Sequence, residues 1–173
     1  LYPGPEMKLP AAAVLSLGAT LALSGDAETR GTRFLLTADG SAAVVARHVA
    51  PIDAPPFGDF VAVAETFLHV PYLWGGRTSI GLDCSALVQL SLAACGVAAP
   101  RDTDLQEAAI GVPAEGPPRH GDLVFWKGHV GIVAGSETLL HASGLHMQVV
   151  KEPLAEALAR IGAPTSVRRL PPR

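Results

Sequence analysis

The stretch "GDLVFWKGHVGIVAGSETLLHAS" (residues 121–143) decides the fold. It holds three apolar runs, "GDLVFW", "HVGIVA" and "TLLHAS", which are separated by the two-residue link "KG" and by a turn near "GSE". Short links between such runs predict hairpins, whose strands pair antiparallel. Because "MQVVKEP" offers a further strand and "PLAEALARIG" a terminal helix, we expect the last third of the chain to form an antiparallel sheet followed by a helix.

Helical patterns precede this sheet. The run "FVAVAETFL" predicts a helix at residues 60–69, and "DCSALVQLSLAACG" predicts a longer one that ends at Gly96. The intervening "PYLWGGRTSIG" is expected to be a loop, because Pro71 and three glycines interrupt regular structure. "RDTDLQEAA" predicts a short helix capped by Asp102 or Thr103. Helices followed by hairpin-connected strands predict an α+β fold.

The first 52 residues have a different pattern. Short strand-like runs, "VLSLGATLALSG", "TRFLLTADG" and "SAAVVARHV", alternate with glycine-containing turns, which indicates a small all-β module. The proline-rich "PIDAPPFGD" then reads as a linker. We therefore expect one domain at residues 1–54 and a second at 55–173.

Composition excludes some functions. The net charge of -3 gives no electrostatic reason to expect nucleic-acid binding. The most apolar stretch, residues 9–23, lacks a basic leader and is interrupted by Pro10 and Gly18. It is also shorter than the roughly 20 residues of a membrane-spanning helix, so we expect neither a signal peptide nor a span.

Cys84 has two interpretations. It could be a small apolar residue that begins a core helix, which is the common fate of cysteine. At the first turn of that helix, however, free N–H groups and the helix dipole favour a thiolate, so Cys84 could also be a nucleophile. Cys95 lies eleven residues further along the same predicted helix, about 16 Å away, so no disulfide is expected. Free thiols favour a reducing compartment.

Two histidines can decide between these interpretations. If residues 134–136 form a three-residue hairpin loop, position 129 lies opposite position 141, and any odd loop length keeps His129 and His141 on one face. One ring can then accept the thiol proton while the other orients it. No His-x-His, Cys-x-x-Cys or His-Glu-x-x-His spacing occurs, so we expect no metal site.

Six short motifs occur in an order that resembles the NlpC-type cysteine peptidase family, papain-like enzymes that cut bacterial cell-wall peptides. They are "PYLWGG" (71–76), "GLDCSALVQ" (81–89), "PRDTDLQ" (100–106), "GDLVFW" (121–126), "HVGIV" (129–133) and "LLHAS" (139–143). One departure is Ala86, where the family usually has glycine after Asp-Cys-Ser. Alanine is also small and suits a helix better.

The resemblance implies a role for each candidate site residue. Cys84 becomes the nucleophile, His129 the general base and His141 the orienting third member. Tyr72 is expected over the cleft, and Asp83 and Ser85 are expected to bind the free α-amino group of the substrate. A carboxylate beside the nucleophile raises the pKa of the thiol, and a bound ammonium would neutralise it. Asp83 is also expected as the helix N-cap.

The resemblance also implies a substrate and a setting. Residues 1–54 are similar to a bacterial SH3-like domain, the second of a possible tandem, which narrows the groove to short peptides. The expected activity is hydrolysis of the γ-D-glutamyl–diaminopimelate bond in L-Ala-γ-D-Glu-diaminopimelate peptides of peptidoglycan, without cofactor or metal. We expect a monomer in the cytoplasm, or in the cell envelope if a signal peptide was removed. The alternatives are a catalytically silent wall-peptide-binding protein and a papain-like acyltransferase.

Overall fold

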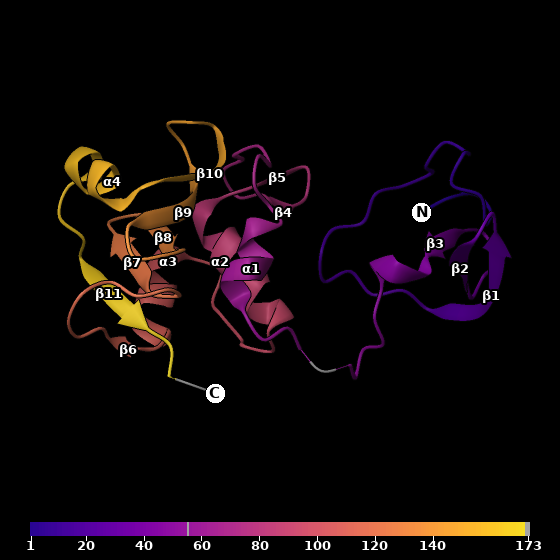
Figure 1. Ribbon diagram of the computed structural model, residues 1–173, viewed down its shortest axis with the longest axis horizontal. Coiled ribbons are helices and arrows are strands. Elements are labelled where there is room, and N and C mark those ends of the chain that lie inside the picture. The colour runs from indigo at the N-terminus through magenta and orange to yellow at the C-terminus, as the bar shows by residue number, and fades with distance from the viewer. Residues whose placement is uncertain (55, 172–173) are drawn as a thin grey trace. The chain divides into compact units, whose positions relative to one another are not determined.

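The computed structural model describes residues 1–54 and 56–171, and this part of the chain divides into two compact units. The first unit is Leu1–Pro55 and the second is Pro56–Arg173. Figure 1 shows the first unit in indigo to purple and the second in magenta to yellow. Each unit has a sheet of its own, so each is described by itself.

The first unit is a small antiparallel sheet in the order β1-β2-β3. Its strands are β1 (Leu23–Thr29), β2 (Thr32–Thr37) and β3 (Ala43–Val45), and a 3-10 turn, η1 (Ala46–His48), follows. The β1–β2 turn has positive φ at both Arg30 and Gly31, the geometry of a tight hairpin. Tyr2 packs edge-on against the buried Phe34, with ring centroids 6.1 Å apart.

The strand predicted in "VLSLGATLALSG" is wrong for most of its length. Regular pairing begins only at Leu23, and the residues before it form turns and irregular backbone. Val14 is 69% exposed, and Leu15 and Leu17 are exposed as well. The apolar run has no buried face to occupy, and without one apolar residues alone do not make a strand.

The second unit is built on an antiparallel sheet in the order β10-β9-β8-β7-β11-β6. The predicted hairpins are present, and the loop between β7 and β8 is the expected Lys127–Gly128 link. Strands β11 and β6 extend the sheet beyond the prediction. The bounds are β6 (Val112–Pro113), β7 (Leu123–Trp126), β8 (His129–Val133), β9 (Thr138–Ser143), β10 (Gln148–Pro153) and β11 (Ser166–Arg169), with a short separate pair β4 (Arg77–Thr78) and β5 (Gly81–Leu82).

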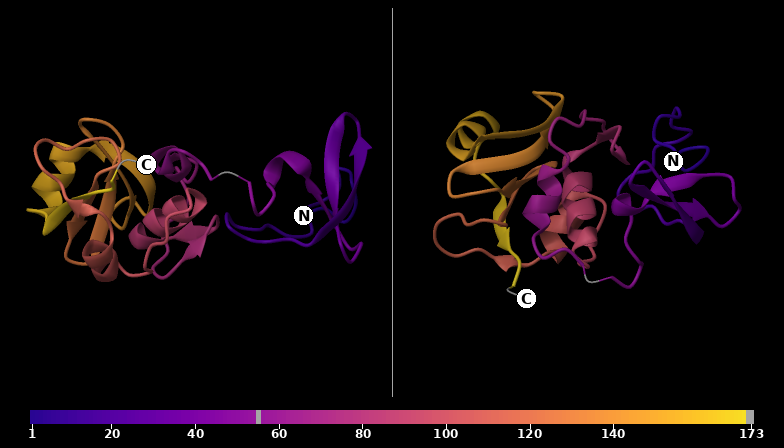
Figure 2. Two further views of the ribbon diagram at one scale, coloured as in Figure 1. Left: turned by 90° about the horizontal axis from the view of Figure 1, so that it is seen from below. Right: turned by 45° about the vertical axis from the view of Figure 1, so that its right-hand side comes forward.

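Helices cover both faces of this sheet, and their bounds are α1 (Phe60–Glu65), α2 (Cys84–Ala94), α3 (Thr103–Ala109) and α4 (Leu154–Ile161). Helix α1 is shorter than predicted, since turns replace it after Glu65. Helices α1 and α2 pack on one face, in a core with Phe125 and Ile132, whereas α4 packs on the other with Val124 and Leu139. Figure 2 shows the sheet between these helices.

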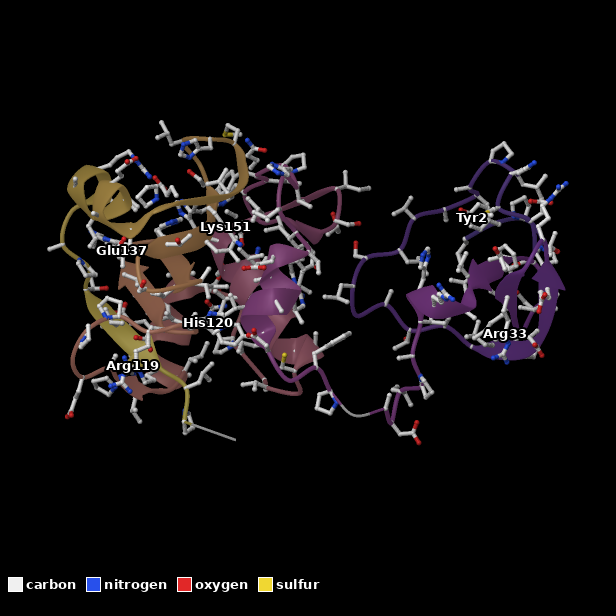
Figure 3. The ribbon with its side chains drawn as sticks, viewed as in Figure 1. Tyr2, Arg33, Arg119, His120, Glu137 and Lys151 are labelled. Atoms are coloured by element: carbon white, nitrogen blue, oxygen red, sulfur yellow. The ribbon has the colours of Figure 1, made fainter. Side chains whose placement is uncertain are left out.

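Alternation along β10 assigns its side chains to these two faces. Val149 lies in the core with α2, and Lys151 points the same way, with its Nζ 2.7 Å from Glu65 Oε1 of α1. Lys151 is labelled in Figure 3. Glu152 therefore points to the face that α4 covers, where its pairing partner is Leu139. No helix among residues 1–54 and 56–171 is long and apolar enough to cross a membrane.

Candidate active site

Cys84 is the first residue of α2, and its side chain is buried among contacts from two other elements. Its Sγ lies 3.9 Å from Thr103 Oγ1, at the start of α3. The backbone N–H of Val130 also donates toward the sulfur. This second contact brings the thiol to the beginning of β8, whose first residue is His129.

The resting state of Cys84 is a protonated thiol. Burial raises the pKa of Cys84, and the negative charge of Asp83 adds to that rise. Hydrogen bonds from Val130 and Thr103 act in the opposite direction without reversing it. The expectation that the helix start stabilises a thiolate is therefore outweighed by burial, and the thiol needs a base to be activated.

The thiol borders a cleft with a volume of about 740 Å³. One wall comes from the loop at Trp74 and from the start of α2, and another comes from the β7–β8 turn at Trp126 and Lys127. The beginning of α3, around Asp102, completes the lining. A cleft of this size accommodates a short peptide, and Cys84 is one of the residues that line it.

His129, which is partly buried, and the buried His141 form a pair, with His129 Nε2 2.7 Å from His141 Nδ1. The prediction that they share one face is confirmed, but the predicted register is wrong. Strand pairing joins Ile132 to Leu140 and Val133 to Leu139, so position 129 is not opposite position 141. The loop is 135–137, shifted by one residue from the prediction. Because this loop still has an odd number of residues, both rings lie on the same face of the sheet.

Both histidines are neutral at physiological pH in this environment. Burial, and then electrostatic interactions with His141 and Arg160, lower the pKa of His129 to about 4, although Glu152 acts in the opposite direction. Burial also lowers the pKa of His141, although Glu152 opposes that effect. Trp126 contributes to the burial of His129, with ring centroids 5.8 Å apart. A neutral imidazole has a free lone pair and is able to accept a proton.

Glu152 extends this pair, and the sequence analysis missed it. Its Oε1 lies 2.6 Å from His141 Nε2, on the side of that ring away from His129. Arg160 of α4 donates to the same carboxylate. The signal was present in the sequence: a β9–β10 hairpin with period-two alternation places Glu152 on the face of His141.

Asp83 and Ser85 lie beside the thiol, and Arg101 holds both. Arg101 Nη1 and Nη2 donate to Asp83 Oδ1 and Oδ2 at 2.9 and 2.6 Å, and Nη1 also donates to Ser85 Oγ at 2.8 Å. Asp83 also accepts from the Ala86 N–H at 2.9 Å, which confirms its predicted role as N-cap.

Arg101 also changes the electrostatics beside the thiol. Burial acts to raise the pKa of Asp83, but Arg101 and the backbone N–H donors hold it below its ordinary value. From the sequence, a bound ammonium was expected to neutralise this carboxylate. The structure supplies a resident guanidinium for the same purpose.

Tyr72 lies near Cys84 and Asp83, but it is not among the described residues that line the cleft, so its expected place over the cleft stays a prediction. Its backbone N–H donates to the carbonyl of Met147, and a parallel bridge joins it to Leu82. Burial raises the pKa of Tyr72, and the nearby charges of Cys84 and Asp83 contribute to that rise. Its hydroxyl therefore stays a proton donor at neutral pH.

The arrangement combines a thiol, a neutral imidazole pair and a peptide-sized cleft. These are the parts that nucleophilic acyl transfer requires: a nucleophile, a base and a group that orients the base. Within residues 1–54 and 56–171, no group of three or more His, Cys, Asp or Glu side chains is placed to hold a metal ion.

Comparison with known families gives one match over this region. The model of the NlpC/P60 family matches residues 69–160. Among curated relatives, a gamma-D-glutamyl-L-lysine dipeptidyl-peptidase of Bacillus subtilis (strain 168) is 38% identical over 93 residues, 49% of this chain and 31% of that protein. Dipeptidyl-peptidase 6 of Lysinibacillus sphaericus is 34% identical over 87 residues, 48% of this chain and 31% of that protein. The chain spans about a third of the length of these relatives.

Solved structures resemble the chain as well. An NlpC/P60 family protein from Bacillus cereus ATCC 10987 superimposes with a TM-score of 0.68 at 25% identity, covering 98% of this chain and 60% of that one. The peptidoglycan hydrolase RipB from Mycobacterium tuberculosis gives a TM-score of 0.53 at 31% identity, covering 64% and 63%. The likeness confirms the predicted α+β papain-like class, preceded by a small antiparallel β region.

Proposed function

The chain belongs to the NlpC/P60 family, and from that premise we propose that it is a cysteine endopeptidase acting on peptidoglycan stem peptides. The observation that carries the proposal is the buried Cys84 thiol at the edge of a peptide-sized cleft, beside the strand that begins with His129. The proposed scissile bond joins γ-D-glutamate to diaminopimelate in L-Ala-γ-D-Glu-diaminopimelate. The relative from Bacillus subtilis, whose name specifies a γ-D-glutamyl-L-lysine bond, supports this class of linkage.

The proposed reaction begins with proton transfer from the Cys84 thiol to His129. Since His129 Nε2 is occupied by His141, Nδ1 is the nitrogen that accepts this proton. The sulfur attacks the γ-carbonyl carbon, and the backbone N–H of Cys84 stabilises the oxyanion together with the Tyr72 hydroxyl. His129 then returns the proton to the leaving amine as the C–N bond breaks. Water, activated by the same imidazole, hydrolyses the thioester and restores the thiol.

The two pKa shifts favour general-base catalysis over a preformed ion pair. The pKa of the Cys84 thiol is raised and that of His129 is lowered to about 4, so both groups are neutral before substrate binds. Proton transfer then accompanies attack on the carbonyl, when the developing imidazolium gains stabilisation from its neighbours.

We propose that the free α-amino group of the substrate lies beside Asp83 and Ser85, as the family resemblance implies. Arg101 already neutralises the carboxylate, so the ammonium meets a hydrogen-bonding site rather than an unpaired negative charge. A comparison of free and N-acetylated L-Ala-γ-D-Glu-diaminopimelate tests this assignment. The free peptide is expected to be cleaved faster, and equal rates would contradict the assignment.

The first unit is proposed to be an SH3-like domain that limits access to short peptides. The likeness to the Bacillus cereus structure, which covers 98% of this chain, and the antiparallel β1-β2-β3 sheet support this. We also propose a role in recycling murein peptides in the cytoplasm, supported by Cys84, which forms no disulfide. Incubation with intact sacculi and with free muropeptides tests both ideas. We expect cleavage of free peptides only, and release of peptides from sacculi would contradict them.

The experiment for the activity itself follows product formation from the tripeptide by mass spectrometry, for the wild type and for Cys84→Ala. The proposal predicts L-Ala-γ-D-Glu and free diaminopimelate from the wild type alone. Undiminished cleavage by Cys84→Ala would overturn the assignment of the nucleophile. Binding without cleavage by the wild type would identify a peptide-binding protein. Transfer of the acyl group to an added amine without hydrolysis would identify an acyltransferase.

A further inference from the structure

We propose that Glu152 is a positioning residue that fixes the proton tautomers of His141 and His129 through a continuous hydrogen-bonded chain. The inference rests on the proposed function, because the tautomer matters only if His129 accepts the proton of Cys84. Glu152 is not among the described residues that line the cleft, and its hydrogen bonds are to His141 and Arg160, so it acts through the two rings and not on the substrate.

The chain of contacts is continuous from β8 to α4. His129 Nε2 lies 2.7 Å from His141 Nδ1, and His141 Nε2 lies 2.6 Å from Glu152 Oε1. Arg160 then donates to that same Oε1. The side chain of His141 is 1% exposed and that of Glu152 is 10% exposed, so water has little access to the hydrogen bond between them.

The carboxylate determines which nitrogen of each ring carries a proton. An ionised carboxylate only accepts hydrogen bonds, so His141 Nε2 must carry the hydrogen that it donates to Glu152. In a neutral ring the other nitrogen, Nδ1, is then an acceptor. His129 Nε2 must therefore donate, which leaves the lone pair of His129 on Nδ1. That lone pair is the one the proposed mechanism uses to take the thiol proton.

Glu152 fixes the tautomers only as an ionised carboxylate, and its surroundings keep it ionised. Burial acts to raise the pKa of Glu152, but Arg160 and His141 together hold it below its ordinary value. The groups that face it come from three elements: Arg160 of α4, His141 of β9 and, beyond that ring, His129 of β8. The neighbouring Lys151 points to the opposite face and pairs there with α1.

The same geometry explains why the pair needs a carboxylate. Two neutral histidines sharing one hydrogen bond have two equivalent arrangements, because either ring can be the donor. In one arrangement Nδ1 of His129 carries the hydrogen and cannot accept the thiol proton. Glu152 removes this arrangement, since it would leave His141 Nε2 unprotonated against a negative oxygen, with a buried acceptor facing a buried acceptor.

Nitrogen-15 NMR of the histidine rings in the full chain near pH 7 tests the proposal in the wild type directly. We expect both His129 and His141 to be Nε2–H tautomers. An Nδ1–H tautomer at either ring would overturn the proposal. Because this measurement does not depend on turnover, it stands apart from the proposed activity: a chain with the expected tautomers but without peptidase activity would refute the function and keep the inference.

The variants Glu152→Leu and Glu152→Gln extend the test. Removal of the acceptor in Glu152→Leu is expected to produce mixed tautomers and to lower kcat/KM by about 10-fold or more, mainly through kcat, within the roughly 10²- to 10⁴-fold that a positioned general base contributes. Glu152→Gln keeps one acceptor oxygen and should lie between the wild type and Glu152→Leu. The matched control is Glu156→Leu, an exposed acid on the neighbouring α4, which should keep both tautomers and the rate.

A merely structural role for Glu152 predicts a different set of results. Thermal unfolding would then fall while the tautomers and the rate of the folded enzyme stayed at wild-type values, and that combination would overturn the proposal. If Glu152→Leu does not fold, Glu152→Gln and the wild-type spectrum decide the question. If the wild type and Glu152→Gln had equal tautomer populations and equal kcat, an uncharged acceptor oxygen would be sufficient. That result would contradict the proposal that the ionised carboxylate of Glu152 fixes the tautomers.

Discussion

Removal of the guanidinium in Arg101→Met tests how the acid beside the nucleophile is tolerated. Asp83 has a side chain that is only 10% exposed, and both of its oxygens contact Arg101, which is itself 26% exposed. Breaking a fully buried ion pair costs about 3 to 5 kcal/mol, because one charge stays buried without a partner. Since Arg101 is partly exposed, we expect the free energy of unfolding to fall by about 2 to 3 kcal/mol.

The assay is urea denaturation of the full chain, followed by a probe in the second unit such as tryptophan fluorescence. Lys151→Met is the matched control in that unit, because its ion pair with Glu65 is more exposed on both sides. Such a surface pair contributes about 0 to 1 kcal/mol, so the control should change little. The double variant Arg101→Met with Asp83→Asn removes the unpaired charge and should recover more than about 1 kcal/mol.

Two outcomes would refute this reasoning. Equal destabilisation by Arg101→Met and Lys151→Met would show that the guanidinium does not compensate a buried charge. No recovery in the double variant with Asp83→Asn would show that the loss comes from packing alone. The charge argument also predicts slower alkylation of Cys84 by iodoacetamide near pH 7 in Arg101→Met, because an uncompensated Asp83 raises the pKa of the thiol further.

Three further predictions concern acid stability, a helix contact and a tight backbone approach. Because the folded protein holds the pKa of His129 at about 4, below its unfolded value near 6.5, the unfolded chain binds the proton first. As the pH is lowered from about 6.5 to about 4, the free energy of unfolding measured by denaturation should fall by up to about 3 kcal/mol. His129→Gln should reduce this loss. Gln106→Leu removes the amide that donates to the backbone carbonyls of Ser85 and Pro100. We expect the free energy of unfolding to fall by about 1 to 3 kcal/mol and kcat to fall as well. Unchanged values would contradict this role of Gln106. Gly111→Ala places a side chain at a φ of 62° against the Arg169 carbonyl and should lower the melting temperature markedly, whereas Gly144→Ala meets open space and should not.

Local patterns in the sequence were sufficient for the main elements of the second unit. The apolar runs and short links of residues 121–143 predicted the hairpins, and an odd loop predicted that His129 and His141 share a face. The exact pairing register of β8 and β9 could not be predicted from the sequence, because a loop at 134–136 and one at 135–137 give the same alternation of side chains. Turn geometry and packing chose between them.

Partners that come together through tertiary contacts were missed. Arg101 reaches Asp83 from 18 positions away, and Arg160 reaches Glu152 from another element, so no local pattern marks either pair. Strand β11 was missed because its place beside β7 depends on contacts with distant segments, among them the Arg169–Asp122 ion pair. In the first unit, the run before Leu23 was misjudged because an apolar composition does not guarantee a face to bury.

The most direct test of the central claim is the fate of L-Ala-γ-D-Glu-diaminopimelate incubated with the wild type, Cys84→Ala and His129→Ala, with products identified by mass spectrometry. Our account predicts cleavage between γ-D-glutamate and diaminopimelate by the wild type. It also predicts a covalent acyl adduct of Cys84 in quenched samples and no cleavage by either variant. Cleavage at the same bond by Cys84→Ala, at the wild-type rate, would contradict it.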